Sequence, residues 1–332
     1  MKRFAIVVSV VAAVVIGFAA AQALNLAEVR EYAPQHDPAV AAAVVRVERA
    51  QETQQRVERD PFALRLDRLA ARHEVEAAAA AHAKAESDSR RAVTDAYLAV
   101  IEAELAADVA ALAEQMSSIT LEATRLRFQH GAVTQHDVDS TQHAYQSAFL
   151  AGRNAEEDLN GARRRLEALV PGLPIDGPFQ AVADLPEVPD LDDLLSAARE
   201  GDTVVAAKRQ LEIATIDLEA KNPQLDAALT IEASRAWLAE AQAGVTRAED
   251  AAVAAVQRNH DVAVRALAAL GMAREGLGLR LERLSVQRAR HESGLISNLD
   301  LMNEEVAVRR AELDVARAVR AYLLAVEALG GL

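Results

Sequence analysis

The chain has 332 residues, of which 26% are charged and 51% apolar but only 3% aromatic, and it carries a formal net charge of −14. This acidic balance argues against nucleic-acid partners, because phosphate binding requires a cationic surface. The absence of cysteine excludes disulfides, thiolate catalysis and Cys-ligated metals. The apolar residues are largely Ala, Leu and Val, which suit closely packed helices, so we expect an ordered, helical chain.

The first 23 residues have the pattern of a signal peptide. Two basic residues at 2–3 precede an apolar stretch at 4–20, and Ala-Gln-Ala at 21–23 is the small-x-small pattern that signal peptidase cuts. An uncleaved membrane anchor is the alternative that the length of the stretch permits. We predict export, with the mature protein starting near Leu24 in the periplasm or elsewhere in the cell envelope, and association with the outer membrane left open.

The first half of the mature chain is predicted to hold three helices. Apolar periodicity and helix breakers predict a helix of about 22 residues that ends before Asp60, a second of about 60 leading to Gly131, and a third of about 38. At the rise of an α-helix these lengths are about 33, 90 and 57 Å. These lengths suggest that one long helix lies beside two shorter helices stacked end to end.

A Pro-rich linker at 171–190 separates this first helical repeat, 24–170, from a second one, 191–332. The second repeat has helical patterns near 202–221, 232–291 and 297–329. In its last segment, apolar residues stand seven apart, which is typical of a coiled-coil seam. These residues are Leu301, Val308, Val315, Tyr322 and Leu329.

One short phrase occurs twice. Residues 131–138 read GAVTQHDV and residues 294–301 read GLISNLDL, at an offset of 294 − 131 = 163. The match continues downstream, where Leu150 pairs with Leu313 at the same offset. The chain therefore consists of two similar halves, and each phrase lies between two long amphipathic helices.

Each phrase predicts a tight turn between two helices. Its glycine can take the left-handed conformation that closes a helix C-terminus. The Thr or Ser three residues later is an N-cap residue, followed by Asp at the third helical position as in a capping box, and the apolar residue before the cap can form a hydrophobic staple. The residues that we assign to the two turn tips are Gly131, Ala132, Val133, Thr134, Asp137, Gly294, Leu295, Ile296, Ser297 and Asp300.

These features together resemble the TolC-type outer-membrane efflux proteins. The resemblance is carried by the double repeat, the Asp-Pro and Asn-Pro that end the first helix of each half, the run AVTDAYLAVIEAEL, and above all FQHGAVTQHDV and HESGLISNLDL. It covers most of the mature chain. It implies a homotrimer whose hairpins form a periplasmic tunnel below a β-barrel, and whose turns meet a periplasmic adaptor (membrane fusion) protein that belongs to an inner-membrane transporter.

The sequence departs from that pattern after the proline of each half. The family has a pair of membrane-spanning strands there, and each such strand needs about ten residues of alternating pattern. Here the segments after Pro61 and Pro223 run almost directly into the next helix, which leaves no room for either pair. We therefore expect an all-α fold of long antiparallel helical hairpins in two repeats, a coiled-coil bundle like the TolC α-barrel without a full β-barrel.

No acid–base pair, nucleophile or metal constellation is visible in the sequence, so we assign no catalytic residue and no cofactor. His130, His136 and His143 cluster around the first turn, but their spacing matches no metal site, and we assign no metal ligand. A ring of His130 or His136 in a trimer could instead titrate near neutrality.

The sequence leaves two functions open. The leading hypothesis is a non-catalytic component of an envelope efflux or export system, a trimeric conduit whose turn tips dock an adaptor protein. The alternative is a structural or scaffolding coiled-coil protein of the cell envelope that no longer forms a channel. An enzyme is a distant third.

Overall fold

The computed structural model describes residues 24–330 apart from 176–177, 181 and 183, and the predicted signal peptide lies outside this part of the chain. Throughout the described residues the regular structure is helical, and the one β interaction is an isolated bridge between Leu24 and Phe179. The predicted all-α fold is confirmed. None of the described helices combines the length and the apolarity that a bilayer span requires.

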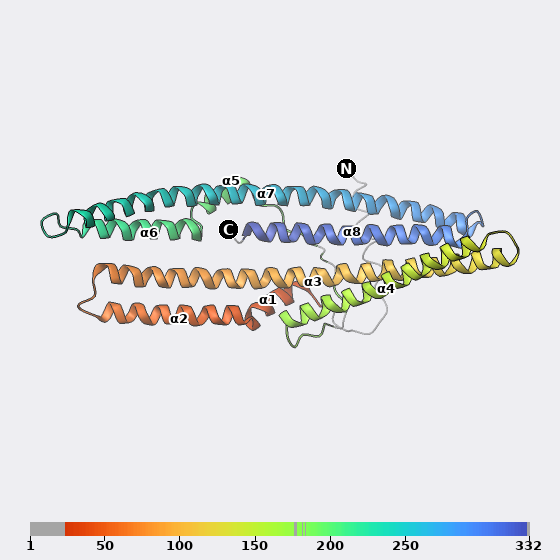
Figure 1. Ribbon diagram of the computed structural model, residues 1–332, viewed down its shortest axis with the longest axis horizontal. Coiled ribbons are helices and arrows are strands. Elements are labelled where there is room, and N and C mark those ends of the chain that lie inside the picture. The colour runs from red at the N-terminus through yellow and green to blue at the C-terminus, as the bar shows by residue number, and fades with distance from the viewer. Residues whose placement is uncertain (1–23, 176–177, 181, 183, 331–332) are drawn as a thin grey trace.

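The first repeat contains α1 (Leu26–His36), α2 (Pro38–Arg59), α3 (Arg65–Gln129) and α4 (Gln135–Leu169). Helix α3 is 65 residues long, and it packs against both α2 and α4, which follow one another along it (Figure 1). Asp37 separates α1 from α2, because its side chain accepts the Ala39 amide at 2.8 Å and Pro38 fits the first helical position. The predicted stacking of two shorter helices beside a long one is confirmed.

The second repeat contains α5 (Leu191–Ala198), α6 (Asp202–Glu219), α7 (Ala228–Glu292) and α8 (Asn298–Gly330). Helix α7 is also 65 residues long and packs against α6 and α8. The offset of 163 residues between the two phrases maps both ends of α3 onto both ends of α7. The sequence repeat is thus a structural repeat. The short helices α1 and α5, which the apolar pattern did not predict, correspond to each other at about the same offset.

Four helices lie side by side in the half of the molecule that holds the repeated phrases. Figure 1 shows α8 between α7 and α3, while α4 lies beyond α3 near the middle of the molecule and crosses it toward the turn, and α3 packs on α4 and α8 as α7 packs on α8. Helices α3 and α8 are therefore inner helices in this half. Helices α4 and α7 form its two opposite edges.

The seam between α7 and α8 follows the heptad repeat that the sequence predicted. On α8, Val308, Tyr322 and Leu329 are buried, while Leu301 and Val315 are half-buried. On α7 the matching seam also has sevenfold spacing, with its members buried or, at position 277, half-buried. These residues are Val256, Ala263, Leu270, Leu277 and Leu284.

Three tyrosine side chains hold the Pro-rich linker against the helices. Each hydroxyl donates to a linker carbonyl oxygen: Tyr32 to Pro171 at 2.7 Å, Tyr97 to Gln180 at 2.9 Å, and Tyr322 to Pro186. The Tyr97 hydroxyl also lies 2.7 Å from the Leu24 carbonyl oxygen, so two acceptors share its proton. Burial raises the pKa of Tyr97 to about 12. The described residues of the linker form no helix, and these hydrogen bonds hold the linker against α1, α3 and α8.

Candidate functional site: the two helix turns and the edges of the bundle

The two repeated phrases lie at one end of the molecule. Figure 1 shows the α3–α4 and α7–α8 turns together at this end, whereas the α2–α3 and α6–α7 turns lie at the other. We call the first end the turn end. The arrangement follows from the repeat, because two hairpins of equal length that pack side by side bring their tips to the same level.

At both turns the preceding helix closes with the same backbone motif. Gly131 and Gly294 have φ values of 70° and 72°, a conformation that glycine adopts without the strain that a Cβ would cause. The next amide in each turn donates back to the carbonyl oxygen five residues earlier. The two bonds are Ala132 to Arg127 at 2.9 Å and Leu295 to Arg290 at 2.8 Å. This is the Schellman arrangement, and it satisfies carbonyl groups that the helix leaves without a partner.

The following helix begins with the predicted capping box in both turns. The Asp137 carboxylate accepts the Thr134 amide and the Thr134 hydroxyl, both at 2.7 Å, while the Asp137 amide donates to the Thr134 hydroxyl oxygen at 3.3 Å. In the second turn the corresponding distances for Ser297 and Asp300 are 3.0, 2.7 and 3.2 Å. Asp therefore replaces the usual Glu of this motif without loss of the reciprocal bonds.

These bonds lower the pKa of both capping carboxyls. The hydroxyl hydrogen bond from Thr134 is the largest cause for Asp137, followed by the Thr134 amide. For Asp300 the Ser297 hydroxyl is the largest cause, again followed by the amide. Each hydrogen bond favours the charged carboxylate, so both turns keep their caps ionised well into the acidic range.

Eight of the ten residues assigned to the turn tips are exposed, while Val133 and Ile296 are half-buried. The half-buried pair therefore supports the turns from within and offers little surface to a partner. Leu295 is 69% exposed and is the largest apolar side chain that the ten residues offer to solvent. The tips thus present one apolar side chain amid polar caps, on a backbone held by its own hydrogen bonds.

The three histidines near the first turn, His130, His136 and His143, are all exposed. In the part of the chain that the structure describes, no group of three or more His, Asp or Glu side chains lies close enough together to hold a metal ion.

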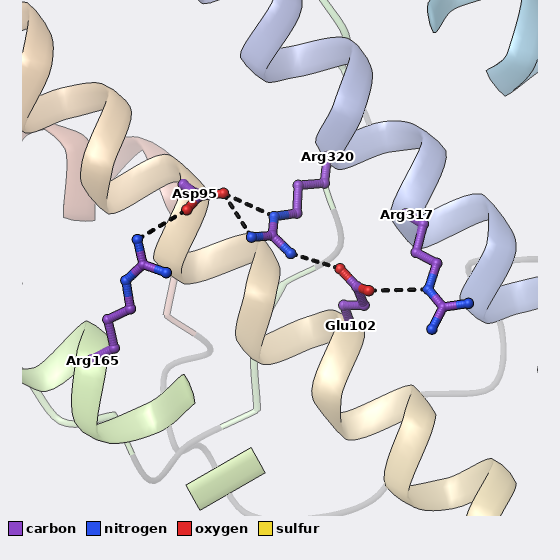
Figure 2. Close-up of polar contacts among 5 residues, drawn as sticks. All are labelled: Asp95, Glu102, Arg165, Arg317 and Arg320. Atoms are coloured by element: carbon purple, nitrogen blue, oxygen red, sulfur yellow. Dashed lines mark hydrogen bonds and ion pairs between the residues drawn. The ribbon is translucent and has the colours of Figure 1, made fainter. Parts of the chain in front are cut away.

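An ion-pair network that the sequence analysis missed joins both repeats near the middle of the molecule. Figure 2 shows Arg320 of α8 between Asp95 and Glu102 of α3, to which its guanidinium donates at 2.9 and 2.8 Å. Arg317 donates to Glu102 at 3.0 Å, and Arg165 of α4 donates to Asp95 at 3.2 Å. Burial opposes the charge on Arg320, but the bonds to Glu102 and Asp95 outweigh it and raise its pKa.

A row of exposed apolar side chains on α7 was also missed. Met272, Leu279 and Val286 stand seven residues apart and are 68, 63 and 57% exposed. Sevenfold spacing places them on one stripe of the helix, on a different face from the buried seam that packs on α8. Large apolar residues with this spacing are typical of a coiled-coil seam, and they indicate a second one on α7. Heptad counting along α7 could have revealed it, but only the structure shows which of the two seams is already covered.

Neither a protein-family model nor a curated protein gives a significant match to the sequence. Solved structures do match. The Campylobacter jejuni CmeC outer membrane channel has a TM-score of 0.65 at 11% identity, over 92% of this chain and 85% of that one. The outer membrane protein VceC from Vibrio cholerae has a TM-score of 0.63 at 17% identity, over 92% and 95% of the two chains.

A third match is the Neisseria gonorrhoeae MtrE outer membrane channel in its open state, with a TM-score of 0.58 at 18% identity, over 92% of this chain and 88% of that one. CmeC and MtrE are described as outer membrane channels. The fold that the sequence resemblance implied is confirmed: the chain has the helical fold of the TolC-like outer-membrane efflux channels.

Proposed function

We propose that this protein is a non-catalytic component of an envelope efflux or export system. Three copies of the chain, the number that the resemblance to the TolC-type proteins implies, surround a helical conduit in the periplasm. The turn end docks a periplasmic adaptor protein that belongs to an inner-membrane transporter. The proposal rests above all on one observation, that both repeated turns lie at the same end with the same closed geometry. A ring of such chains would present a rim of identical tips to one partner.

The large surface of the single chain supports association. Its accessible surface is 21414 Å², whereas a compact monomer of 35.6 kDa exposes about 13,000 Å². Elongation accounts for part of the excess. The exposed heptad row of α7 is one part of this surface where association is expected, since an apolar row of this kind is normally covered by another helix.

A scaffolding protein would also associate with other copies of the chain, but its turn end would not bind an adaptor. Leu295 separates the two functions, because only docking would cover this exposed side chain at the turn end with a partner. The two functions therefore differ in what a substitution at the turn end should do.

The test is a pull-down of the host's purified periplasmic adaptor by wild-type protein and by Leu295→Asp. We expect the variant to lose adaptor binding and to keep the native mass of the wild type. Leu225→Asp is the matched control, because Leu225 is an 84% exposed leucine in the α6–α7 turn at the opposite end. Equal binding by all three proteins would contradict docking through Leu295. A wild-type protein that binds no adaptor would contradict the docking proposal itself and leave the scaffolding function.

A further inference from the structure

The contact between α3 and α8 gives a template for a contact that a single chain cannot make. Along α3, positions 95, 102, 109, 116 and 123 stand seven apart, and the first two, Asp95 and Glu102, pair with α8 (Figure 2). Adding the repeat offset of 163 carries α3 onto α7 and α4 onto α8. The equivalent of the α3–α8 contact is therefore a contact between α7 and α4. These two helices form opposite edges of the bundle, so only two different copies can make it.

The charges at the equivalent positions are inverted. Asp95 and Glu102 on α3 correspond to Arg258 and Arg265 on α7, and Arg320 on α8 corresponds to Glu157 on α4, as the printed sequence shows. Within the chain one arginine lies between two carboxylates. At the equivalent site one carboxylate would lie between two arginines. Arg258, Arg265 and Glu157 are exposed, and none of them takes part in an ion pair within the described chain.

The apolar positions further along the two helices agree with this equivalence. Leu313 of α8 is 7% exposed, whereas its counterpart Leu150 on α4 is 60% exposed. Val109 and Met116 of α3 are half-buried, whereas their counterparts on α7, Met272 and Leu279, are 68 and 63% exposed. The exposed side chains on α7 and α4 are thus the counterparts of side chains that are buried or half-buried on α3 and α8.

We propose that α7 of one copy packs on α4 of the next through these rows, with Glu157 of one copy between Arg258 and Arg265 of its neighbour. This pairing rests on the proposed association and assigns its contact surface. It also explains why the signs are opposite. If α7 took the place of α3 against α8, Arg258 would face Arg320, and like charges brought together at a contact oppose it. The opposite signs of the charges therefore prevent α7 of one copy from replacing α3 against α8.

The equivalence is not complete in every residue. Arg317 of α8 corresponds to Asn154 on α4, and Arg165 of α4 corresponds to Ala328 on α8. The proposed contact thus keeps the central ion pairs of the network in Figure 2 and lacks its two outer arginines.

A charge swap tests the pairing. Light scattering would measure the native mass of the wild type, Arg258→Glu, Glu157→Arg and the double variant over a range of concentrations. We expect each single variant to raise the concentration needed for association at least about tenfold, and the double variant to recover most of this loss. Arg247→Glu is the matched control on the same helix, because its α3 counterpart, Lys84, keeps 69% of its side chain exposed and so faces no neighbour.

Cysteine cross-linking gives a second readout, since the natural chain has no cysteine. The double variant with Met272→Cys and Leu150→Cys should oxidise to covalently linked oligomers. Each single variant has one cysteine per chain and should give at most a disulfide-linked dimer. An associated wild type with unaffected single charge variants and no cross-link would overturn the pairing and leave the conduit proposal standing. A wild type that remains monomeric at every concentration would overturn both.

Discussion

Helices α3 and α7 have the same length and the same place in their repeats, yet they differ in burial. Twelve residues of α3 are buried, but only five of α7. Most of the difference comes from residues 89–100 of α3, which hold seven of its twelve buried residues, because α1, the end of α4, the linker and α8 pack around this stretch. Toward the repeated turns, α3 packs on both α4 and α8, whereas α7 packs on α8. The repeated sequence thus gives α3 and α7 the same length and the same turns. Helices of the same chain cover the second face of α3, whereas the second face of α7 has no such cover within the described chain.

The largest expected effect comes from removing the arginine that joins the repeats. Arg320→Leu leaves Asp95 and Glu102 without their shared partner, and its side chain is 27% exposed, so we expect a loss of about 2–3 kcal/mol in the free energy of unfolding. Glu157→Leu at the equivalent position of α4 should leave the stability of the single chain within about 0.5 kcal/mol of the wild type. Denaturant unfolding at low protein concentration measures both. Equal losses would mean that Glu157 already has a partner within the chain.

A second pair of substitutions compares the two helices where both are fully covered. Val93 of α3 and Val256 of α7 are equivalent at the repeat offset, and both are 0% exposed. Truncation to Ala removes two methyl groups and leaves a cavity, so each variant should lose about 2 kcal/mol in chemical denaturation. If Val256→Ala were neutral, the α7–α8 seam would be looser than its burial indicates.

The turn glycines should give a smaller and equal effect. Gly131→Ala and Gly294→Ala each place a Cβ on a residue with positive φ, which costs about 1 kcal/mol, and no neighbouring atom lies within 4 Å of that Cβ to add a clash. Thermal unfolding of the two variants should therefore shift by the same small amount. A much larger shift in one of them would show that the two tips are not equivalent.

The capping carboxyls of both turns should give the free energy of unfolding a small dependence on pH in the acidic range. The pKa values of Asp137 and Asp300 are lowered in the folded protein by hydrogen bonds from Thr134 and Ser297. Their stabilisation is therefore present above the ordinary aspartate pKa and is lost as the pH falls through the lowered values. Asp137→Asn and Asp300→Asn should each flatten the acid side of the stability profile. A profile that is unchanged in both variants would mean that the caps do not contribute.

At alkaline pH the free energy of unfolding should change in the opposite direction, falling as the pH rises. Burial raises the pKa of Tyr97 to about 12, above its ordinary value of 10.0, so its contribution is present below pH 10 and is lost as the pH rises toward 12. In Tyr97→Phe this part of the alkaline loss should be absent, and the stability at neutral pH should fall by about 1 kcal/mol because two carbonyl acceptors lose their donor. Retention of the full alkaline loss in the variant would assign it to other groups.

The sequence predicted the helices and the turns because their determinants are local. The α3–α4 turn follows from Gly131, Thr134 and Asp137, whose bonds reach only a few residues along the chain. The start of α7 was expected near 232 and lies at Ala228, because Pro223 breaks the helix earlier than apolar periodicity registers. Helix ends are thus predicted less closely than helix identity.

The contacts between the repeats were not predictable in the same way. Asp95 and Arg320 are far apart in the sequence, and both read as charges on a solvated helix face until the order of the helices is known. The burial of Val133 and Ile296 depends likewise on how the tips pack, which the phrase itself does not specify. Once the structure gives the order α4, α3, α8 and α7, the repeat becomes informative again, because it shows which positions of α7 and α4 lack a partner.

The central claim is that the single chain is an incomplete layer of helices that other copies complete. The most direct test is the native mass of the wild type and of Leu279→Glu, measured side by side by light scattering, since Leu279 lies in the middle of the exposed row of α7. We expect three times the mass of one chain for the wild type and a single-chain mass with unchanged helicity for the variant. A variant that keeps the wild-type mass, or a wild type that is monomeric, would contradict the central claim.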